Sequence, residues 1–344
     1  MAPAHHRRKL IRQLARARGL ILLGPGDLCL HRLRHGRGFR FVDEDGVTLR
    51  DKDTLTRLKA LAVPPAYEKV RFAAEARGHL QAVGEDAAGR RQYRYHPQWQ
   101  EVREAAKTER LADLARALPE IQRAVRRRLA RRDESLDYAS AVVIHLVAAT
   151  ALRAGSESYA RERGTRGATT LLKSNIQIEG RTLSLRFRAK GSKLVARAVD
   201  DRRLVTAIQQ LFALPGRRLF QHRKEDGIVR SVRAGDVNTF LRQISGRQIS
   251  LKDFRTMVAS VGVLGTLATA KPAASERLRR SQVRSAVAVA AEELTNTSAV
   301  CRTSYVHDSV VVAFERGTLP RLIKQDSSPA ERVAALAKIL TRHG

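Results

Sequence analysis

Apolar and polar positions alternate with a period of two in several short stretches between about Leu20 and Trp99. The stretches GFRFVD (38–43), KVRFAA (69–74) and HLQAVG (79–84) have this strand pattern, and the turn signals DEDG and EDAAGRR follow two of them. In LAVPPAYEKV the Pro-Pro pair favours extended backbone and excludes a helix. The pattern therefore predicts a β-rich N-terminal region.

From about Glu101 the apolar positions recur every three or four residues instead, which is typical of helices that bury one face. A hairpin interrupts this pattern at residues 174–199, where we expect two alternating strands joined at the tripeptide EGR. Ser327 and Ser328 stand before Pro329 at the expected start of the last helix. The helical pattern covers residues 101–118, 119–132, 138–155, 234–244, 251–269, 281–296 and 328–342.

The change of pattern places a domain boundary near His96 to Gln100. A chain of 344 residues is long enough for two domains with separate cores. We therefore expect an α+β protein in three parts: a basic N-terminal arm at residues 1–19, a small β-rich domain at 20–98, and a larger, mainly α-helical domain with a β-hairpin at 99–344.

The charge of the chain indicates the kind of partner that it binds. The 65 lysines and arginines against 34 acidic residues give a formal net charge of +31, which favours a polyanion. Arginine dominates the basic residues, and its planar fork suits phosphate better than lysine does. Nucleic acid is therefore the expected partner. A membrane is the weaker alternative, because the longest apolar run, residues 139–152, is too short to span a bilayer.

Cysteine usage and the N-terminus narrow the class further. Cys29 and Cys301 lie far apart without metal-ligand spacing, so we expect no disulfide scaffold, no metal site and no cofactor. Residues 1–19 are rich in arginine and free of acids, as in an organellar transit peptide, but they lack serine. We interpret them as a basic arm that contacts DNA, and we expect a cytoplasmic protein.

Five reactive side chains stand far apart in the sequence, and each alone has an ordinary structural explanation. An arginine after an apolar helix offsets the helix dipole, and a lysine in a turn is simply exposed. An arginine three residues after a lysine shares a helix face with it, an asparagine ends a helix, and a tyrosine packs its ring in a core. The signal is their order along the chain: Arg153, Lys190, Arg255, Asn296 and Tyr305.

This order, with its flanking residues, resembles the catalytic pentad of type IB DNA topoisomerases in the compact form shared by poxviruses and many bacteria. The resemblance implies that Tyr305 is the nucleophile, that Arg153, Arg255 and Asn296 hold the phosphate, and that Lys190 is the general acid. Lys193 is a rival for that last role, because AKGSK offers two lysines. The similarity extends over nearly the whole chain, in VPPAYEKV, HLQAVGEDAAGRRQYRYHPQW, LRAGSESYARERGTRGATTL, FRAKGSK, DVNTFLR, KDFRT and NTSAVCRTSYV.

The implied activity is relaxation of supercoiled DNA through a 3′-phosphotyrosyl intermediate, without ATP or metal. The implied partner is double-stranded DNA, held by a monomer that closes around the duplex in the bacterial nucleoid. The block RRQYRYHPQW interleaves basic and aromatic side chains, a mixture suited to the DNA backbone. The candidate DNA contacts are Arg90, Arg91, Tyr93, Arg94, Tyr95, His96, Tyr159, Arg161, Arg166, Thr169, Thr170 and Lys252.

The chain departs from the family pattern at a few positions beside these residues. Thr295 and Ser298 replace the usual Gly and Pro of GNTP, and Asp308 replaces a proline shortly after the tyrosine. No reacting group is removed, but altered turns around Asn296 and Tyr305 favour a lower activity than in typical members. The other departures are Ala189, Leu251 and Met257.

Two other hypotheses explain part of the sequence. A tyrosine recombinase shares the tyrosine and two arginines, but it usually has His-x-x-Arg where this chain has Lys252-x-x-Arg255. A non-catalytic basic DNA-binding protein accounts for the charge, but it gives no reason for five reactive residues in one order. The sequence therefore favours the topoisomerase.

Overall fold

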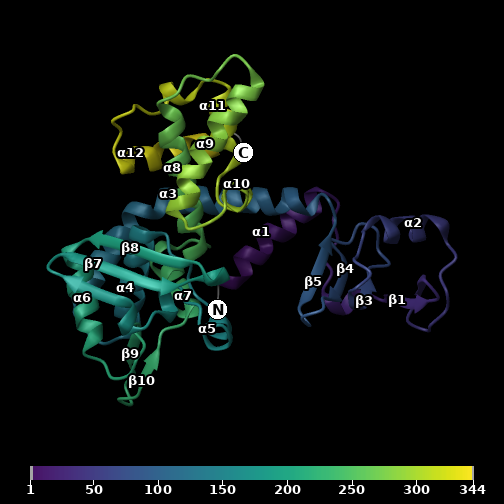
Figure 1. The fold of residues 1–344 in the computed structure, drawn as a ribbon, viewed down its shortest axis with the longest axis horizontal. Helices are drawn as coiled ribbons and strands as arrows, with labels where there is room; N and C mark the ends of the chain where they lie inside the picture. The colour runs from purple at the N-terminus through teal and green to yellow at the C-terminus, as the bar shows by residue number, and fades with distance from the viewer. Residues whose placement is uncertain (1–2, 343–344) are drawn as a thin grey trace. The chain divides into compact units, whose positions relative to one another are not determined.

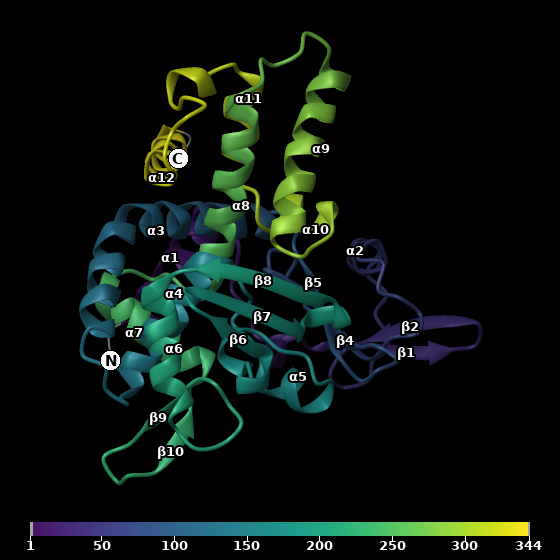
Figure 2. The same ribbon diagram turned by 60° about the vertical axis from the view of Figure 1, so that its left-hand side comes forward.

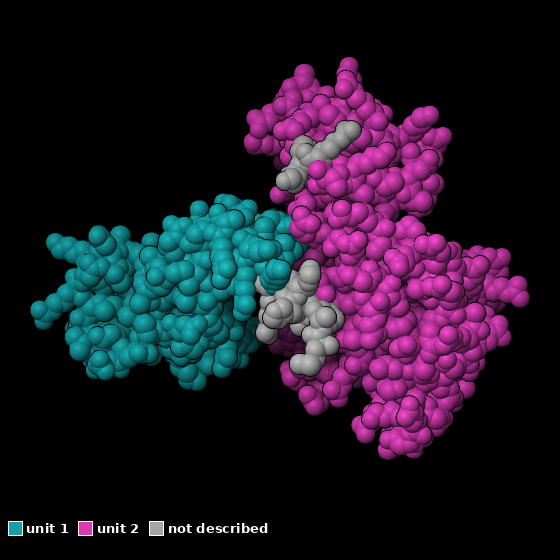
Figure 3. Space-filling view, turned by 180° about the vertical axis from the view of Figure 1, so that it is seen from behind, with its two compact units in different colours: residues 1–107 teal, residues 108–344 magenta. Residues whose placement is uncertain are grey.

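The computed structural model describes residues 3–342 of the chain. The chain divides into two compact units, residues 1–107 and 108–344, which Figure 3 shows in different colours. One helix, α3 (Trp99–Leu129), begins in the first unit and continues into the second. No helix within residues 3–342 is both long and apolar enough to cross a membrane.

The first unit is built around a five-stranded antiparallel sheet in the order β2-β1-β3-β4-β5. Its strands and helices are α1 (Pro3–Ala17), β1 (Leu30–His35), β2 (Gly38–Val42), α2 (Lys52–Ala60), β3 (Glu68–Phe72), β4 (Leu80–Glu85) and β5 (Arg91–Tyr95). The predicted strands at 38–43, 69–74 and 79–84 are confirmed. Helix α2, which the sequence pattern did not indicate, begins where Asp51 accepts a hydrogen bond from the backbone N–H of Thr54.

Because side chains alternate between the two faces of a strand, the apolar side chains of this sheet gather on one face, where they form a core with α2. Leu30, Phe72 and Ala82 are paired across β1, β3 and β4 and pack with Leu58 of α2 in one core. Within residues 3–19 of the predicted arm, α1 is a helix, and Ala15 joins a second small core with Leu20, Trp99 and Val102. The first unit therefore has small, separate cores.

The second unit has one large core, formed mainly by helices and a three-stranded sheet (Figure 1). Helix α4 (Leu136–Thr150) is buried nearly all round and packs against α6 (Arg202–Phe212) and α7 (Ala234–Ser245). Helix α8 (Leu251–Ala268) packs against α9 (Glu276–Glu293) and α12 (Pro329–Arg342), as Figure 2 shows. The remaining elements are α5 (Glu157–Glu162), β6 (Ile176–Glu179), β7 (Thr182–Arg188), β8 (Leu194–Asp200), β9 (Gln221–Arg223), β10 (Val229–Ser231), α10 (Ser298–Ser304) and α11 (Asp308–Glu315).

Two expectations for this region need correction. The helical stretches 101–118 and 119–132 form one helix, α3, in spite of Pro119. Burial of Leu114 and Ile121 on either side of the proline continues one apolar stripe, and each side chain contributes roughly 1.5–3 kcal/mol against a proline cost of about 3. Residues 174–199 hold three strands, not two, because Gly191 and Ser192 adopt positive φ and form a second turn between β7 and β8.

Candidate active site

Arg255 lies one turn inside α8 and is buried, with 4% of its surface exposed. A buried guanidinium needs acceptors, and backbone carbonyls supply them: one terminal nitrogen donates to Ala151 O and the other to Leu294 O at 3.0 Å. The Nε atom of Arg255 has no partner within the described chain. Burial lowers the pKa of Arg255, and Tyr305 partly offsets this. The arginine is therefore fixed by the main chain at two points, with donors to spare.

Tyr305 follows the last residue of α10, and its ring lies against Arg255. Only 8% of its surface is exposed, and Cζ of Arg255 is 4.9 Å from the ring centroid. Burial raises the pKa of the Tyr305 phenol, whereas the charge of Arg255 and a hydrogen bond from it lower the pKa. The charges of Arg153 and Lys252 act in the same direction as Arg255, so the pKa of Tyr305 lies below the ordinary tyrosine value.

Asn296 is placed by the way that α9 ends. The N–H of Thr295 donates to Glu292 O at 3.0 Å and that of Asn296 to Ala291 O at 2.8 Å, the pair of bonds found when a helix ends in a left-handed residue. Thr295 has φ 51° and takes that left-handed position. The side-chain oxygen of Asn296 accepts a hydrogen bond from Arg153, while its buried Nδ2 has no partner within residues 3–342.

Arg153 stands in a loop whose backbone packs closely against the backbone of Gly167 and Ala168. The carbonyl of Arg153 accepts from the N–H of Ala168 at 2.7 Å. A Cβ at Gly167 would lie 2.6 Å from that same carbonyl oxygen, so only glycine fits there. Thr169 and Thr170 are buried, and their hydroxyls donate to the carbonyls of Ala154 (2.9 Å) and Gly167 (3.1 Å).

This burial changes the role that we assign to the two threonines. Their hydroxyls serve the loop that carries Arg153 and do not reach the surface in this structure. Direct contact of Thr169 and Thr170 with DNA stays a prediction. Their effect on the site is to hold Arg153.

Lys190 is exposed in the turn between β7 and β8, one residue after the buried Ala189. The N–H of Ala189 donates to the carbonyl of Lys193 at 2.8 Å and closes this turn. Ala189 also lines a small pocket with Arg153 and Arg255. The structure thus brings together Arg153, Arg255, Asn296 and Tyr305. Lys190 lies on an exposed turn, one residue after a residue that lines the pocket of Arg153 and Arg255.

Comparison with known proteins gives two matches to family models and one to a curated relative. Residues 96–318, about two thirds of the chain, match the model described as Eukaryotic DNA topoisomerase I, catalytic core. Residues 38–86 match Bacterial DNA topoisomerase IB, N-terminal domain. DNA topoisomerase 1B of Acanthamoeba polyphaga mimivirus is 27% identical over 289 residues, covering 80% of this chain and 84% of the relative. The chain belongs to the type IB DNA topoisomerases.

The five residues of the pentad lie within the matched part of this topoisomerase. Four other residues of the second unit are candidate DNA contacts. Tyr159 is 42% exposed and Arg163 lies over its ring at 5.2 Å. Arg161 and Lys252 are exposed. Arg166 is partly buried and lines the pocket with Arg153 and Arg255, and burial, with Arg218 beside it, lowers the pKa of its guanidinium.

The candidate contacts of the first unit lie on and around β5, which is an edge strand of the topoisomerase's N-terminal sheet. Tyr93 and Tyr95 are 40% and 41% exposed, and their rings stack at 6.2 Å between centroids. Arg91 is exposed. These three side chains lie on alternate positions of β5 and share one face of the sheet.

The other three predicted contacts on this segment are engaged within the protein. Arg90 forms an ion pair with Asp86 at 2.8 Å, and Arg94 donates to the carbonyl of Ala62 at 3.2 Å. His96 accepts a hydrogen bond from the N–H of Gln98 at 3.2 Å. Burial and the nearby Arg77 lower the pKa of His96. Whether any of the six binds DNA stays a prediction.

Sequence reasoning missed a basic hollow on the same sheet. Lys69, Arg71 and Arg91 line it together with His31. The signal was present in the stretch EKVRF, where Val70 and Phe72 are buried. Arg71 lies opposite the buried Phe72 by alternation, whereas Lys69 sits at a bulge in β3 and pairs with Glu85, which also lines the hollow.

Proposed function

We propose that this topoisomerase relaxes supercoiled DNA by transesterification at Tyr305. The phenol oxygen attacks a backbone phosphorus, forms a 3′-phosphotyrosyl bond and expels the 5′-oxygen. The phenolic proton leaves, and the 5′-oxygen gains a proton. Religation is the reverse reaction, so the phosphodiester energy is retained and ATP is not needed. The observation that carries this proposal is the Arg255–Tyr305 pair, in which a fixed cation lies 4.9 Å from the ring and lowers the pKa of its phenol.

The phosphate would be held by groups that the structure leaves with unused donors. Negative charge develops on the non-bridging oxygens as the tyrosine attacks, and preorganised donors stabilise it, each by about 10²–10³ in rate. Among the residues that the structure describes, Nε of Arg255 and Nδ2 of Asn296 have no hydrogen-bond partner. Arg153, bonded to Asn296 through its guanidinium, completes the set. These cationic and amide donors provide charge stabilisation without a divalent metal.

Lys190 would protonate the leaving 5′-oxygen. An alkoxide is a poor leaving group, and a positioned acid contributes roughly 10²–10⁴ in rate. The exposed turn between β7 and β8 gives the lysine freedom to reach that oxygen once DNA is bound. Lys190 is preferred to Lys193 because it comes directly after the stretch FRA, where the family resemblance places the catalytic lysine.

Both units would contact the duplex, as a monomer that closes around it. The first unit contributes exposed Arg91, Tyr93 and Tyr95 and the second contributes Arg161 and Lys252. Such a clamp neutralises about 6–10 phosphates, so the affinity for DNA should fall by roughly 10³–10⁵ between about 50 and 200 mM salt. A salt titration of duplex binding measures this, and a nearly flat slope would contradict the clamp.

Trapping with denaturant tests the covalent step. Wild type, mixed with duplex DNA in EDTA without nucleotide and then denatured, should be joined to a strand, leaving a free 5′-hydroxyl at the break. Tyr305→Phe should bind DNA and form no adduct. Tyr138→Phe is the matched control, because it removes the hydroxyl of another buried tyrosine, one with no hydrogen-bond partner in the described part of the chain. An adduct that persists in Tyr305→Phe, or one through a 5′-phosphate, would refute the assignment.

A further inference from the structure

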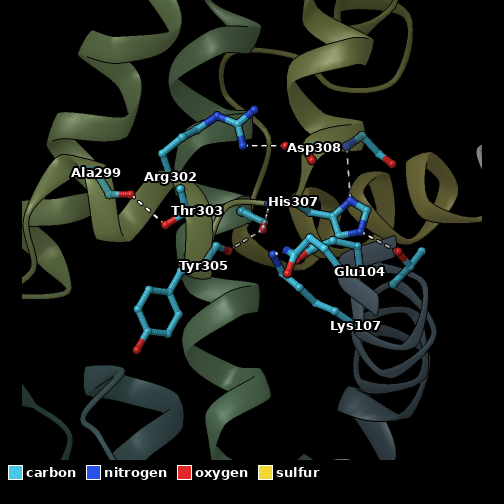
Figure 4. A network of polar contacts seen from close by, with 12 residues as sticks. Glu104, Lys107, Ala299, Arg302, Thr303, Tyr305, His307 and Asp308 are labelled. Carbon is cyan, nitrogen blue, oxygen red and sulfur yellow. Dashed lines mark hydrogen bonds and ion pairs between the residues drawn. The ribbon is translucent and has the colours of Figure 1, made fainter. Parts of the chain in front are cut away.

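A single serine hydroxyl holds the main chain on both sides of Tyr305. Ser260 lies on α8, five positions after Arg255, and is fully buried. Its Oγ donates to the carbonyl of Tyr305 at 3.1 Å and accepts from the N–H of His307 at 3.0 Å. Figure 4 shows Tyr305 and His307 on either side of this contact, with the phenol pointing away from it.

We propose that Ser260 is a positioning residue for the covalent step: it fixes the backbone of the nucleophile segment to the same helix that carries Arg255. The inference rests on the proposed role of Tyr305 as nucleophile. Because both groups are anchored to α8, their separation is set by one rigid element and not by the loop between α10 and α11.

The other attachments of this segment hold it to other helices. On the N-terminal side, the carbonyl of Cys301 in α10 accepts from the N–H groups of Tyr305 (2.9 Å) and Val306 (3.0 Å). On the C-terminal side, the ring of His307 accepts from the N–H of Ser309 at 3.2 Å and bonds to the hydroxyl of Thr108 in α3 at 2.7 Å.

Loss of the Ser260 hydroxyl should therefore displace the main chain around Tyr305 more than it destabilises the fold. The segment stays attached to α10 and α11, but the carbonyl of Tyr305 and the N–H of His307 lose their shared partner in a buried place. The backbone can then shift along α8. A displacement of about 1 Å in a reacting group is enough to cost on the order of 10² in rate.

The test compares Ser260→Ala with two matched substitutions, Ser140→Ala and Ser245→Ala, which remove the hydroxyl of another buried serine. Ser140 is equally buried, and its hydroxyl has no partner among residues 3–342. The hydroxyl of Ser245 bonds only to nearby backbone: it donates to the carbonyl of Leu241 at 2.7 Å and accepts from the N–H of Arg247 at 3.3 Å. Ser260→Thr keeps the hydroxyl and serves as the conservative variant. For each protein we would measure the single-turnover cleavage and religation rates, the Kd for duplex DNA, the pH dependence of cleavage, and the folded fraction by circular dichroism.

We expect Ser260→Ala to slow cleavage and religation about tenfold to hundredfold, with Kd within about twofold of wild type. The pH–rate profile should also move to higher pH, because a displaced phenol loses the charge of Arg255 that lowers its pKa. Ser260→Thr should recover part of the rate, and Ser140→Ala and Ser245→Ala should cleave as wild type does.

Two results would overturn the role of Ser260. One is cleavage by Ser260→Ala at the rate of Ser140→Ala. The other is a loss that merely follows the folded fraction, with an unmoved pH profile. Failure of the proposed role of Tyr305 as nucleophile would look different from failure of the role of Ser260. In that case wild type itself would form no covalent adduct, or Tyr305→Phe would still form one.

Discussion

The buried side of the candidate site and the turn that carries Lys190 differ in how far the protein itself fixes them. Arg255 is held by two carbonyls from distant parts of the chain, and Tyr305 packs on its guanidinium. Lys190 is exposed, in a turn where Gly191 and Ser192 take positive φ. If the proposed roles hold, the charge-stabilising groups are in place before DNA arrives, whereas the proposed proton donor, Lys190, is placed by the substrate.

Within this comparison of the two parts of the site, the largest effect is expected from removing the proposed proton donor, Lys190. Lys190→Ala should slow cleavage of ordinary DNA by roughly 10²–10⁴, because the 5′-oxygen then leaves without a proton. A substrate with sulfur at the 5′-bridging position should be cleaved almost normally, since a thiolate leaves without help. Single-turnover cleavage of the two substrates, measured side by side, checks this.

Lys193→Ala is the control for the lysine turn, as a second exposed lysine three residues away. It should cleave both substrates at nearly the wild-type rate. If the sulfur substrate rescues Lys193→Ala and leaves Lys190→Ala slow, the acid is Lys193. The contrast between the buried side of the site and the exposed turn would then still hold, with Lys193 in place of Lys190 as the acid.

A smaller loss is expected on the fixed side. Arg255→Lys keeps a charge but cannot reach both the carbonyl of Ala151 and that of Leu294, so cleavage should fall by about 10²–10³. Arg255→Ala also removes the charge that lowers the pKa of Tyr305, and its rate should rise only at a higher pH than in wild type. Cleavage rates measured across pH compare the two variants. Equal pH profiles in Arg255→Ala and wild type would show that Arg255 does not activate the phenol.

The sequence predicted which residues lie together at the candidate site better than it predicted how each of them is held. Local periodicity indicated α8, and so the position of Arg255 on a helix. The carbonyls that fix Arg255 lie 104 and 39 residues away along the chain, at Ala151 and Leu294. Such pairings depend on tertiary packing, which no short-range pattern encodes.

Missed elements have a similar cause. Lys190 was placed in a turn, but β8 follows this turn after only a few residues, and the pattern indicated two strands where the structure has three. Thr169 and Thr170 were predicted to contact DNA, and the hydrogen bonds of their hydroxyls to the loop after α4 could not be read from the sequence. A polar residue reveals that it needs a partner, but not whether the partner is DNA or the protein's own backbone.

The smallest effect expected is a gain, at the turn that places Asn296 on the fixed side. Thr295 adopts φ 51°, a left-handed conformation that costs an ordinary residue about 1–2 kcal/mol and suits β-branched side chains least. Thr295→Gly removes this strain but raises the entropy of the unfolded chain by an equivalent of roughly 0.4–1 kcal/mol. We expect a net gain of about 0.5–1 kcal/mol, or roughly 1–4 °C in Tm. Thr297→Gly is the matched control: Thr297 has an ordinary φ of −85° and its side chain accepts from the N–H of Val300, so that variant should gain nothing. Thermal unfolding of the three proteins measures the difference, and a Thr295→Gly protein no more stable than Thr297→Gly would show that the turn is not strained.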